Sequence, residues 1–243
     1  YDAFQEALDA SRDGARIRVA AGAYGGGLLA LLDDLVIEGA GSALSYIVAA
    51  PDATGLTLRG DRSAISGLSI TGGRFGLAYE DISGASVKDC VVALQQGSPN
   101  QEAAGIRVSA SAGLSLERVV IDGVTGGLGS NDYHGNSGTL GAGILVDDSQ
   151  GLSFKDGVIR DISGGPGGKA TSGYGNGGAG GKAGAIYLRG GSSNVEVSSS
   201  TLEIVTGGAA GSRGGNAGTL YAWAGTAAGL YGDASSGARL WSS

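Results

Sequence analysis

The fold is decided by the stretch Gly105-Ile-Arg-Val-Ser-Ala-Ser-Ala-Gly-Leu-Ser-Leu-Glu-Arg-Val-Val-Ile-Asp-Gly-Val124. Its pattern returns in residues 143–162 and 185–204: a Gly or Ala step, a short apolar strand, then a second apolar alternation in the same register. Alternation with period two is typical of β-strands, and its return in successive segments is typical of repeat architectures. The three copies predict a solenoid in which equivalent strands stack about 4.8 Å apart.

Short strands of this kind run through most of the chain. They begin at residues 17, 36, 56, 77, 106, 144, 186 and 230, so the spacing grows from 19 to 44 residues. About 20 residues are enough for one turn of a parallel solenoid with two or three short strands. An antiparallel meander is not favoured, because Asp-Gly and Asn-Gly steps do not recur at the close intervals at which hairpin turns would join consecutive short strands. The sequence predicts one all-β domain, a single-stranded parallel β-helix of about eight coils.

The domain divides into three regions, which are a cap at 1–14, compact coils at 15–124 and coils with Gly-rich insertions at 125–243. In the cap, Asp2 and Gln5 form a capping-box pattern, and Phe4, Ala7 and Leu8 share one helical face. We expect a short helix over residues 3–10 that covers the open first coil.

The spacing widens because Gly-rich insertions follow the second alternation, at 125–142, 164–183 and 206–227. Since they occupy the same place in successive coils, we expect a stacked lateral layer, in which glycine allows close backbone approach. The alternative is a set of flexible low-complexity loops. The layer carries side chains that we predict to bind glycans by stacking and hydrogen bonding, namely Tyr133, His134, Tyr174, Tyr221 and Trp223. The competing interpretation is that these rings only pack the Gly segments onto the solenoid.

A family resemblance rests on three features of the sequence, namely Ala15-Arg-Ile-Arg-Val-Ala-Ala-Gly-Ala-Tyr24, Val36-Ile-Glu-Gly-Ala-Gly41 and the repeated Gly-Ile-x-Val rungs. They resemble right-handed parallel β-helix proteins of the pectate lyase-like fold. In character the chain is most similar to Gly-rich bacterial surface or secreted β-helix repeat proteins. The resemblance implies a right-handed helix over nearly the whole chain, and it is unspecific for function.

Composition argues against several classes of function. The formal net charge is −7, which argues against nucleic acid and anionic membrane surfaces as partners. One Cys excludes an internal disulfide, and one His excludes most His-based metal sites. The sequence contains no long apolar span, so we expect no membrane insertion. The absence of Met indicates a processed or excised chain, and together these features favour a secreted or cell-surface protein.

Polysaccharide cleavage is the activity that the resemblance implies. Hydrolysis needs two carboxylates, and Asp147-Asp148 follow a strand. In polygalacturonases, however, the Asp pair precedes a His-Gly step, whereas His134-Gly135 comes first here. Lyases of this fold hold calcium with acidic residues and use an Arg or Lys base. For the lyase chemistry, Asp122, Asp148, Arg160 and Asp161 could approach one another across adjacent coils. The catalytic candidates for cleavage of either kind are therefore Asp147, Asp148, Arg160 and Asp161. The alternative is that these are solvated turn residues.

One segment resembles a calcium motif. Gly126-Gly-Leu-Gly-Ser-Asn-Asp132 is similar to the calcium nonapeptide of RTX β-rolls, in which consecutive copies share the ion. The second and third insertions contain no Asp or Glu that would complete such a site. We therefore expect no cofactor, and the residues that would hold calcium are Asp122, Asp132 and Asp148.

The leading hypothesis is a non-enzymatic extracellular or cell-surface structural or adhesive module. Its partners would be glycans, other surface polymers, or further copies along the solenoid axis. The alternatives are a polysaccharide lyase or hydrolase, and a tail-spike-like assembly component. Three or more carboxylates with a basic residue in one groove would favour the enzyme. For assembly we expect Leu240 and Trp241 to lie at the contact, because an open last coil can pair with another chain; the alternative is an irregular cap.

Overall fold

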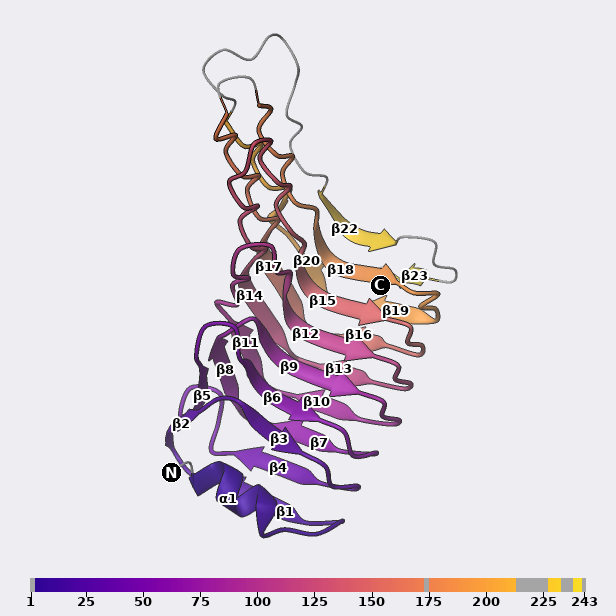
Figure 1. Cartoon of the computed structure of the whole chain (residues 1–243). Helices are drawn as coiled ribbons and strands as arrows, with labels where there is room; N and C mark the ends of the chain where they lie inside the picture. Colours follow the sequence, from indigo (N-terminus) through magenta and orange to yellow (C-terminus); the bar gives the residue numbers. More distant parts are fainter. Residues whose placement is uncertain (1–2, 173–174, 213–226, 233–237, 242–243) are drawn as a thin grey trace.

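The computed structural model is a right-handed parallel β-helix, which rises in Figure 1 from the N-terminal helix at its base. It describes residues 3–172, 175–212, 227–232 and 238–241. Strands of three sheets alternate along the chain, and each pairs in parallel with strands of the neighbouring coils. The predicted parallel β-helix is confirmed. Within the described ranges, no helix is long and apolar enough to cross a membrane.

The sheets are named A, B and C in chain order. Sheet A contains β1 (Arg16–Val19), β4 (Val36–Gly39), β7 (Ala64–Ser66), β10 (Ser86–Lys88), β13 (Ser115–Glu117), β16 (Ser153–Lys155), β19 (Val195–Ser198) and β23 (Ala238–Trp241). Sheet B contains β2 (Gly22–Gly25), β5 (Ser45–Ala49), β8 (Ser69–Gly72), β11 (Val91–Ala93), β14 (Val120–Thr125), β17 (Val158–Ser163), β20 (Thr201–Leu202) and β21 (Val205–Thr206). Sheet C contains β3 (Leu28–Ala30), β6 (Thr54–Leu58), β9 (Phe75–Glu80), β12 (Ala103–Ser109), β15 (Gly141–Asp147), β18 (Ala183–Arg189) and β22 (Ala227–Gly232).

Two details of the predicted strand pattern are wrong. The strands at 17 and 36 are β1 and β4 of sheet A, whereas those from residue 56 onward belong to sheet C. The second alternation is two strands in two sheets, because the chain turns at Arg118, whose φ is 51°. The turn is so short that the apolar alternation continues through it. The described strands complete seven coils and β23 starts another, so the count of eight coils is not confirmed.

The core consists of aliphatic and aromatic side chains stacked in register along the axis. Each sheet supplies one such column, with Ile65, Val87, Leu116 and Phe154 in sheet A, Ile70, Val92, Ile121 and Ile159 in sheet B, and Leu77, Ile106, Ile144 and Ile186 in sheet C. All of them are buried. Each coil therefore covers the apolar surface of its neighbours, and stability depends on the stack.

The Gly-Ile step that repeats in sheet C is a packing requirement. A Cβ atom on Gly105 would lie 2.4 Å from Ile121 Cγ2, and one on Gly143 would lie 2.4 Å from Ile159 Cγ2. Ordinary van der Waals contacts of a Cβ begin near 3.4 Å. Only glycine lets these strands pass so close to sheet B, which is why this step marks the same place in successive coils.

The first coil is closed by α1 (Ala3–Asp9), as predicted. Phe4 and Leu8 are buried in the core beneath it. The Gln5 side chain pairs with the exposed edge of sheet C: its Oε1 accepts from the Leu29 N–H at 2.9 Å, and its Nε2 donates to the Leu29 carbonyl at 3.1 Å. Asp2, the other half of the capping-box pattern, lies outside the described residues.

Candidate functional site

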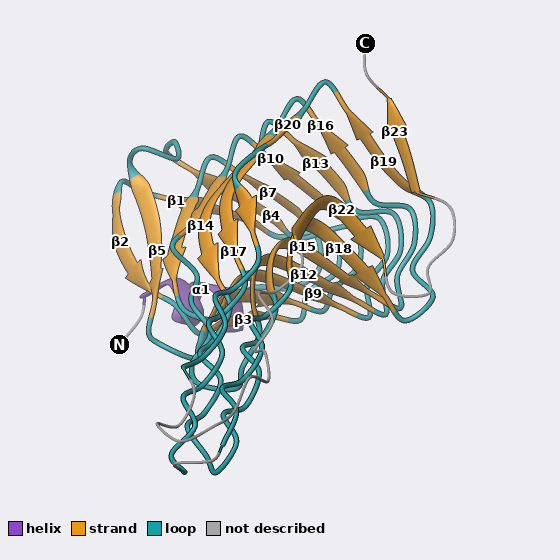
Figure 2. Ribbon diagram, turned by 90° about the horizontal axis from the view of Figure 1, so that it is seen from above, coloured by secondary structure: helices purple, strands orange, loops and turns teal. Residues whose placement is uncertain are grey.

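A narrow projection stands on the corner between sheets B and C and extends away from the solenoid (Figure 2). It consists of the connections from sheet B to sheet C, in the described segments 94–102, 126–140, 164–172, 175–182 and 207–212. In the described segments the insertions leave from the same flank and lie against one another, as the predicted lateral layer requires; most of the third insertion lies outside the described residues. The layer begins one coil earlier than predicted, because residues 94–102 form its base.

The segments of the projection are ordered arms held together by close backbone contacts. On one arm, every third residue is a buried glycine: Gly175, Gly178 and Gly181. The Gly178 N–H donates to the Gly168 carbonyl at 2.9 Å. A Cβ on Gly178 would lie only 1.8 Å from the Asn136 carbonyl oxygen. A three-residue repeat is that of polyproline II, whose backbone makes no internal hydrogen bonds and is free to bond sideways.

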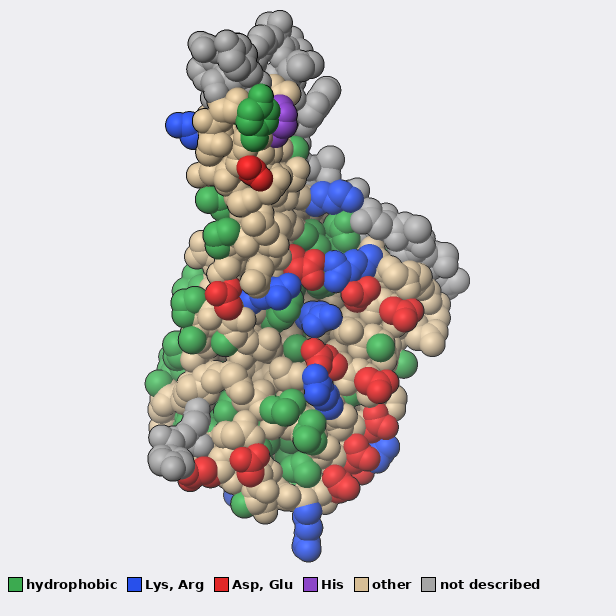
Figure 3. All heavy atoms as spheres, in the orientation of Figure 1, with side chains coloured by type: hydrophobic (Ala, Val, Ile, Leu, Met, Phe, Trp, Pro, Cys, Tyr) green, Lys and Arg blue, Asp and Glu red, His purple; other side chains and the backbone are tan. Residues whose placement is uncertain are grey.

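Ion pairs connect successive coils on the outer face of sheet C, where Figure 3 shows a band of charged side chains beside the projection. Glu80 Oε2 lies 2.7 Å from Arg59 Nη2, and its Oε1 lies 3.4 Å from Arg107 Nη1. Higher up, Arg189 Nη1 lies 2.7 Å from Glu102 Oε2. We call this set the sheet C network, and its members are Arg59, Arg74, Glu80, Glu102, Arg107, Asp147 and Arg189.

Buried rings support the network at the foot of the projection. The Arg74 and Arg107 guanidinium carbons lie 4.6 and 5.5 Å from the ring centroid of Phe75. Phe75 belongs to a small apolar cluster outside the core, which also contains Leu145 and Tyr187. Such contacts between cations and rings, together with the ion pairs, hold these guanidinium groups in place on the sheet.

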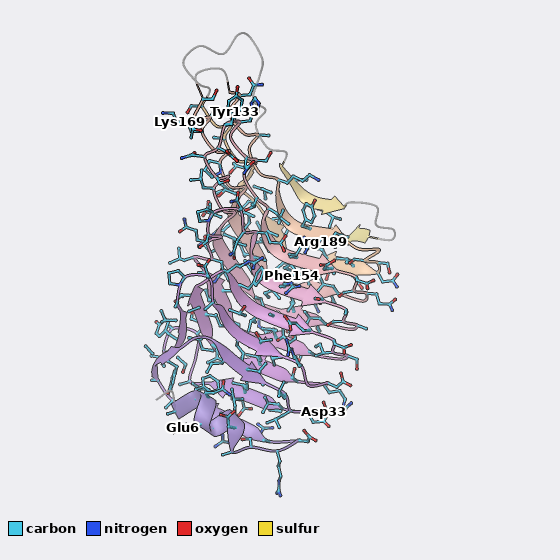
Figure 4. All side chains as sticks on the ribbon, in the orientation of Figure 1. Glu6, Asp33, Tyr133, Phe154, Lys169 and Arg189 are labelled. Atoms are coloured by element: carbon cyan, nitrogen blue, oxygen red, sulfur yellow. The ribbon has the colours of Figure 1, made fainter. Side chains whose placement is uncertain are left out.

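Arg189, which is labelled in Figure 4, contacts two carboxylates, since its Nη2 also lies 2.9 Å from Asp147 Oδ2. Its hydrogen bonds to Glu102 raise the pKa of the Arg189 guanidinium, and Asp147 adds to this effect, although partial burial opposes both. Arg189 therefore remains a cation. It can neutralise an anionic ligand, but it cannot act as a base.

The structure separates the catalytic candidates that the sequence suggested. Asp147 belongs to the sheet C network, and Asp148 follows it in the turn towards sheet A. Arg160 and Asp161 lie in β17 of sheet B, where Arg160 Nη2 is 2.8 Å from Asp122 Oδ2. This hydrogen bond raises the pKa of Arg160, so Arg160 is unsuited to be a base.

Sequence reasoning missed most of the sheet C network, including Arg107 and Glu102. A signal was present in the repeat: in the strand register, Glu80, Asp147 and Arg189 fall in one column along the outer face of sheet C. Aligning the coils at the equivalent steps Gly76-Leu77, Gly143-Ile144 and Ala185-Ile186 would have placed these charges above one another.

The three residues considered for calcium do not share a site. Asp122 lies on sheet B, Asp132 on the projection, and Asp148 in the turn after sheet C. In the part of the chain that the structure describes, no group of three or more His, Cys, Asp or Glu side chains is placed to hold a metal ion.

The residues considered for glycan binding are only partly described. Tyr133 and His134 lie in the projection and contact each other edge to face, with ring centroids 4.8 Å apart. Figure 4 shows Tyr133 far from Arg189 and close to the outer end of the described projection. The other three candidates, Tyr174, Tyr221 and Trp223, lie outside the described residues.

The two assembly candidates, Leu240 and Trp241, belong to β23, whose backbone pairs with β19 of the preceding coil. Their side chains lie outside the described part of the structure.

No protein family model and no curated protein sequence matches this chain. Solved structures similar to it include a pectin methylesterase in complex with a hexasaccharide, with 10% identity and a TM-score of 0.40 over 85% of this chain and 78% of the other. A protein of Geobacillus virus E2 has 9% identity and a TM-score of 0.43 over 81% of this chain and 48% of the other. An alginate lyase from Paenibacillus sp. has 17% identity and a TM-score of 0.30 over 95% of both chains. The parallel β-helix itself is shown by the strand pairing of this chain, and similarity at this level carries no information about activity.

Proposed function

We propose that this chain binds an acidic polysaccharide along the outer face of sheet C, beside the projection. The observation that carries the proposal is the row of guanidinium groups in the sheet C network, from Arg59, Arg74, Arg107 and Arg189. These side chains come from several coils, and adjacent coils are about 4.8 Å apart. The cations are therefore distributed along the axis, as a linear polyanion requires.

Charge favours uronate units over neutral sugars. The four Arg of the network and nearby Lys182 lie with three carboxylates, in a chain whose formal net charge is −7. Asp81 and Asp148 lie in the turns that follow strands β9 and β15 of sheet C. Their negative charges mark the boundary of the Arg-rich face on this side. Guanidinium groups match carboxylates well because their planar donors can contact both oxygens. An extracellular polymer would suit the secreted or surface location that the composition favours.

Cleavage of the same polymer is a second candidate function, because the face holds three carboxylates with basic residues, the feature expected of an enzyme. We favour elimination over hydrolysis. Hydrolysis needs a carboxylic acid with a proton to donate. Glu80 and Glu102, however, accept hydrogen bonds from the guanidinium groups of Arg59 and Arg189.

A contact beside Arg189 supports elimination specifically. Lys182 Nζ lies 3.3 Å from the Tyr187 hydroxyl oxygen, and Tyr187 is on the same strand as Arg189. In an elimination, a base removes the proton α to the uronate carboxylate, the bond to the leaving sugar oxygen breaks as a C=C bond forms, and an acid protonates that oxygen. Arg189 would neutralise the carboxylate, and the exposed Lys182 amine, in contact with the buried Tyr187 hydroxyl, would transfer the protons.

The test measures binding and cleavage separately. Affinity electrophoresis in gels containing polygalacturonate or alginate should retard the protein, whereas dextran should not. Arg107→Ala should weaken binding about tenfold to a hundredfold, the loss of one charge-assisted contact of about 1.5–3 kcal/mol. Arg18→Ala, which removes a cation 82% exposed on sheet A, is the matched control and should bind normally.

Elimination would be recognised by the ultraviolet absorbance of the unsaturated product. Loss of that signal in Tyr187→Phe with binding retained would support the lyase, and its absence in the wild type would leave binding as the function. If the wild type binds neither polymer, or if Arg107→Ala and Arg189→Ala bind as well as the wild type, the proposal is wrong.

A further inference from the structure

The projection carries an aromatic pair that is separate from the sheet C network. Tyr133 and His134 are in edge-to-face contact, with an interplanar angle of 82°. Tyr133 is 57% exposed, the largest exposure of any Tyr or Phe side chain among those the structure describes. In Figure 4 it lies beside Lys169 near the outer end of the described arms. A large ring in this position gains nothing from core packing, so its role lies elsewhere.

Contacts between two arms hold this pair in place. The Asn176 N–H donates to His134 Nδ1 at 3.2 Å. The Tyr133 N–H donates to Asp132 Oδ1 at 2.7 Å, while the Asp132 carbonyl accepts from the Thr171 N–H at 2.8 Å. The backbone on which both rings sit is therefore fixed before any ligand arrives, which lowers the entropic cost of binding.

We infer that Tyr133 and His134 form a binding site for a neutral saccharide near the outer end of the described arms. The ring of Tyr133 offers an apolar face for the C–H groups of a sugar. Because His134 Nδ1 accepts a hydrogen bond, the neutral imidazole carries its hydrogen on Nε2, which can donate to a sugar hydroxyl. Asn131 lies nearby and is fixed in turn, since its Oδ1 accepts from the Lys169 N–H at 2.7 Å.

The size and charge of this site distinguish a saccharide from other ligands. A stable protein interface needs about 1,000 Å² or more of buried surface, which one exposed ring on narrow arms does not supply. The charged residues described beside the pair are Asp132 and Lys169, one of each sign. This balance favours a neutral sugar, in contrast to the Arg-rich face of sheet C.

The experiment applies the full chain to an array of neutral oligosaccharides. The wild type should bind a subset of them, and Tyr133→Ala should weaken that binding at least about tenfold, whereas Tyr133→Phe should keep most of it because the ring remains. Tyr46→Ala is the matched control: Tyr46 is 37% exposed on sheet B and should not matter for binding.

The two sites are tested independently. Arg107→Ala should lose polyuronate binding while its array binding stays normal, and Tyr133→Ala should show the reverse. Amide hydrogen exchange in the arms checks that Tyr133→Ala keeps the projection intact. If the wild type binds no neutral oligosaccharide, or if a correctly folded Tyr133→Ala binds as well as the wild type, the inference is overturned.

Discussion

Gly178→Ala is the most direct perturbation of the projection. The added Cβ would lie 1.8 Å from the Asn136 carbonyl oxygen and 2.3 Å from its carbon, where ordinary contact begins near 3.4 Å. Both atoms belong to a neighbouring arm, so the two backbones must separate. The Gly178 N–H donates to Gly168, and the Gly211 N–H donates to Gly178, at 2.9 and 2.8 Å. Displacement of Gly178 away from Asn136 strains both hydrogen bonds, which join Gly178 to two other arms.

The expected cost follows from these two bonds. At about 0.5–1.5 kcal/mol each, their loss lowers the local opening free energy by about 1–3 kcal/mol. Since about 1.4 kcal/mol corresponds to a factor of ten, hydrogen exchange at Gly178 and Gly211, whose N–H groups donate these bonds, should accelerate about fivefold to 150-fold. Strands of the solenoid should keep their protection, because the arms make no part of its core.

Native-state hydrogen exchange by mass spectrometry or NMR measures this difference. Ala179→Ser is the matched control, because its position on the same arm already carries a Cβ and is only half-buried. If Gly178→Ala and Ala179→Ser exchange alike in the arms, the close backbone packing described for the projection is wrong.

Three further predictions concern the solenoid. Phe154→Ala removes a buried core ring and should lower the free energy of unfolding by about 3–5 kcal/mol in urea titration; an effect below 1 kcal/mol would contradict the stacked core. Gln5→Ala removes both hydrogen bonds to Leu29 and should raise hydrogen exchange in β3 and concentration-dependent association in sedimentation, whereas unchanged behaviour would show that the edge needs no cap. The hydrogen bond from Arg118 lowers the pKa of Asp89 below its usual 3.8, so the pair stabilises the fold above that value and loses this effect as the pH falls through the lower pKa. The Tm difference between wild type and Arg118→Ala should therefore shrink on acidification below about pH 4, and a difference that grows would refute the assignment.

The fold was predictable from sequence where a local rule repeated. A glycine before the inward-facing Leu or Ile marks a place where a Cβ does not fit. It recurs in four successive coils, at Gly55, Gly76, Gly105 and Gly143, and reveals the parallel stack. The assignment of strands to sheets failed at Arg118, because the turn there uses a positive φ without the Gly, Asn or Asp that signals one.

The site was harder to predict because its contacts are distant in sequence. Arg189 and Glu102 are 87 residues apart, and their hydrogen bonds depend on the strand register and on the lengths of the insertions. By contrast, the sequence correctly placed Asp122 near Arg160, since these residues lie in the same alternation of adjacent coils. Insertions shift the numbering by different amounts in each coil, so long-range pairs become visible only when the register is known.

The central claim, that sheet C holds an acidic polysaccharide, is tested most directly by a crystal structure of the chain with a trisaccharide of galacturonate. The account predicts the sugar on the outer face of sheet C beside the projection, with uronate carboxylates within hydrogen-bond distance of Arg107 or Arg189. A trisaccharide found only on sheet A, on sheet B or at Tyr133 would contradict it.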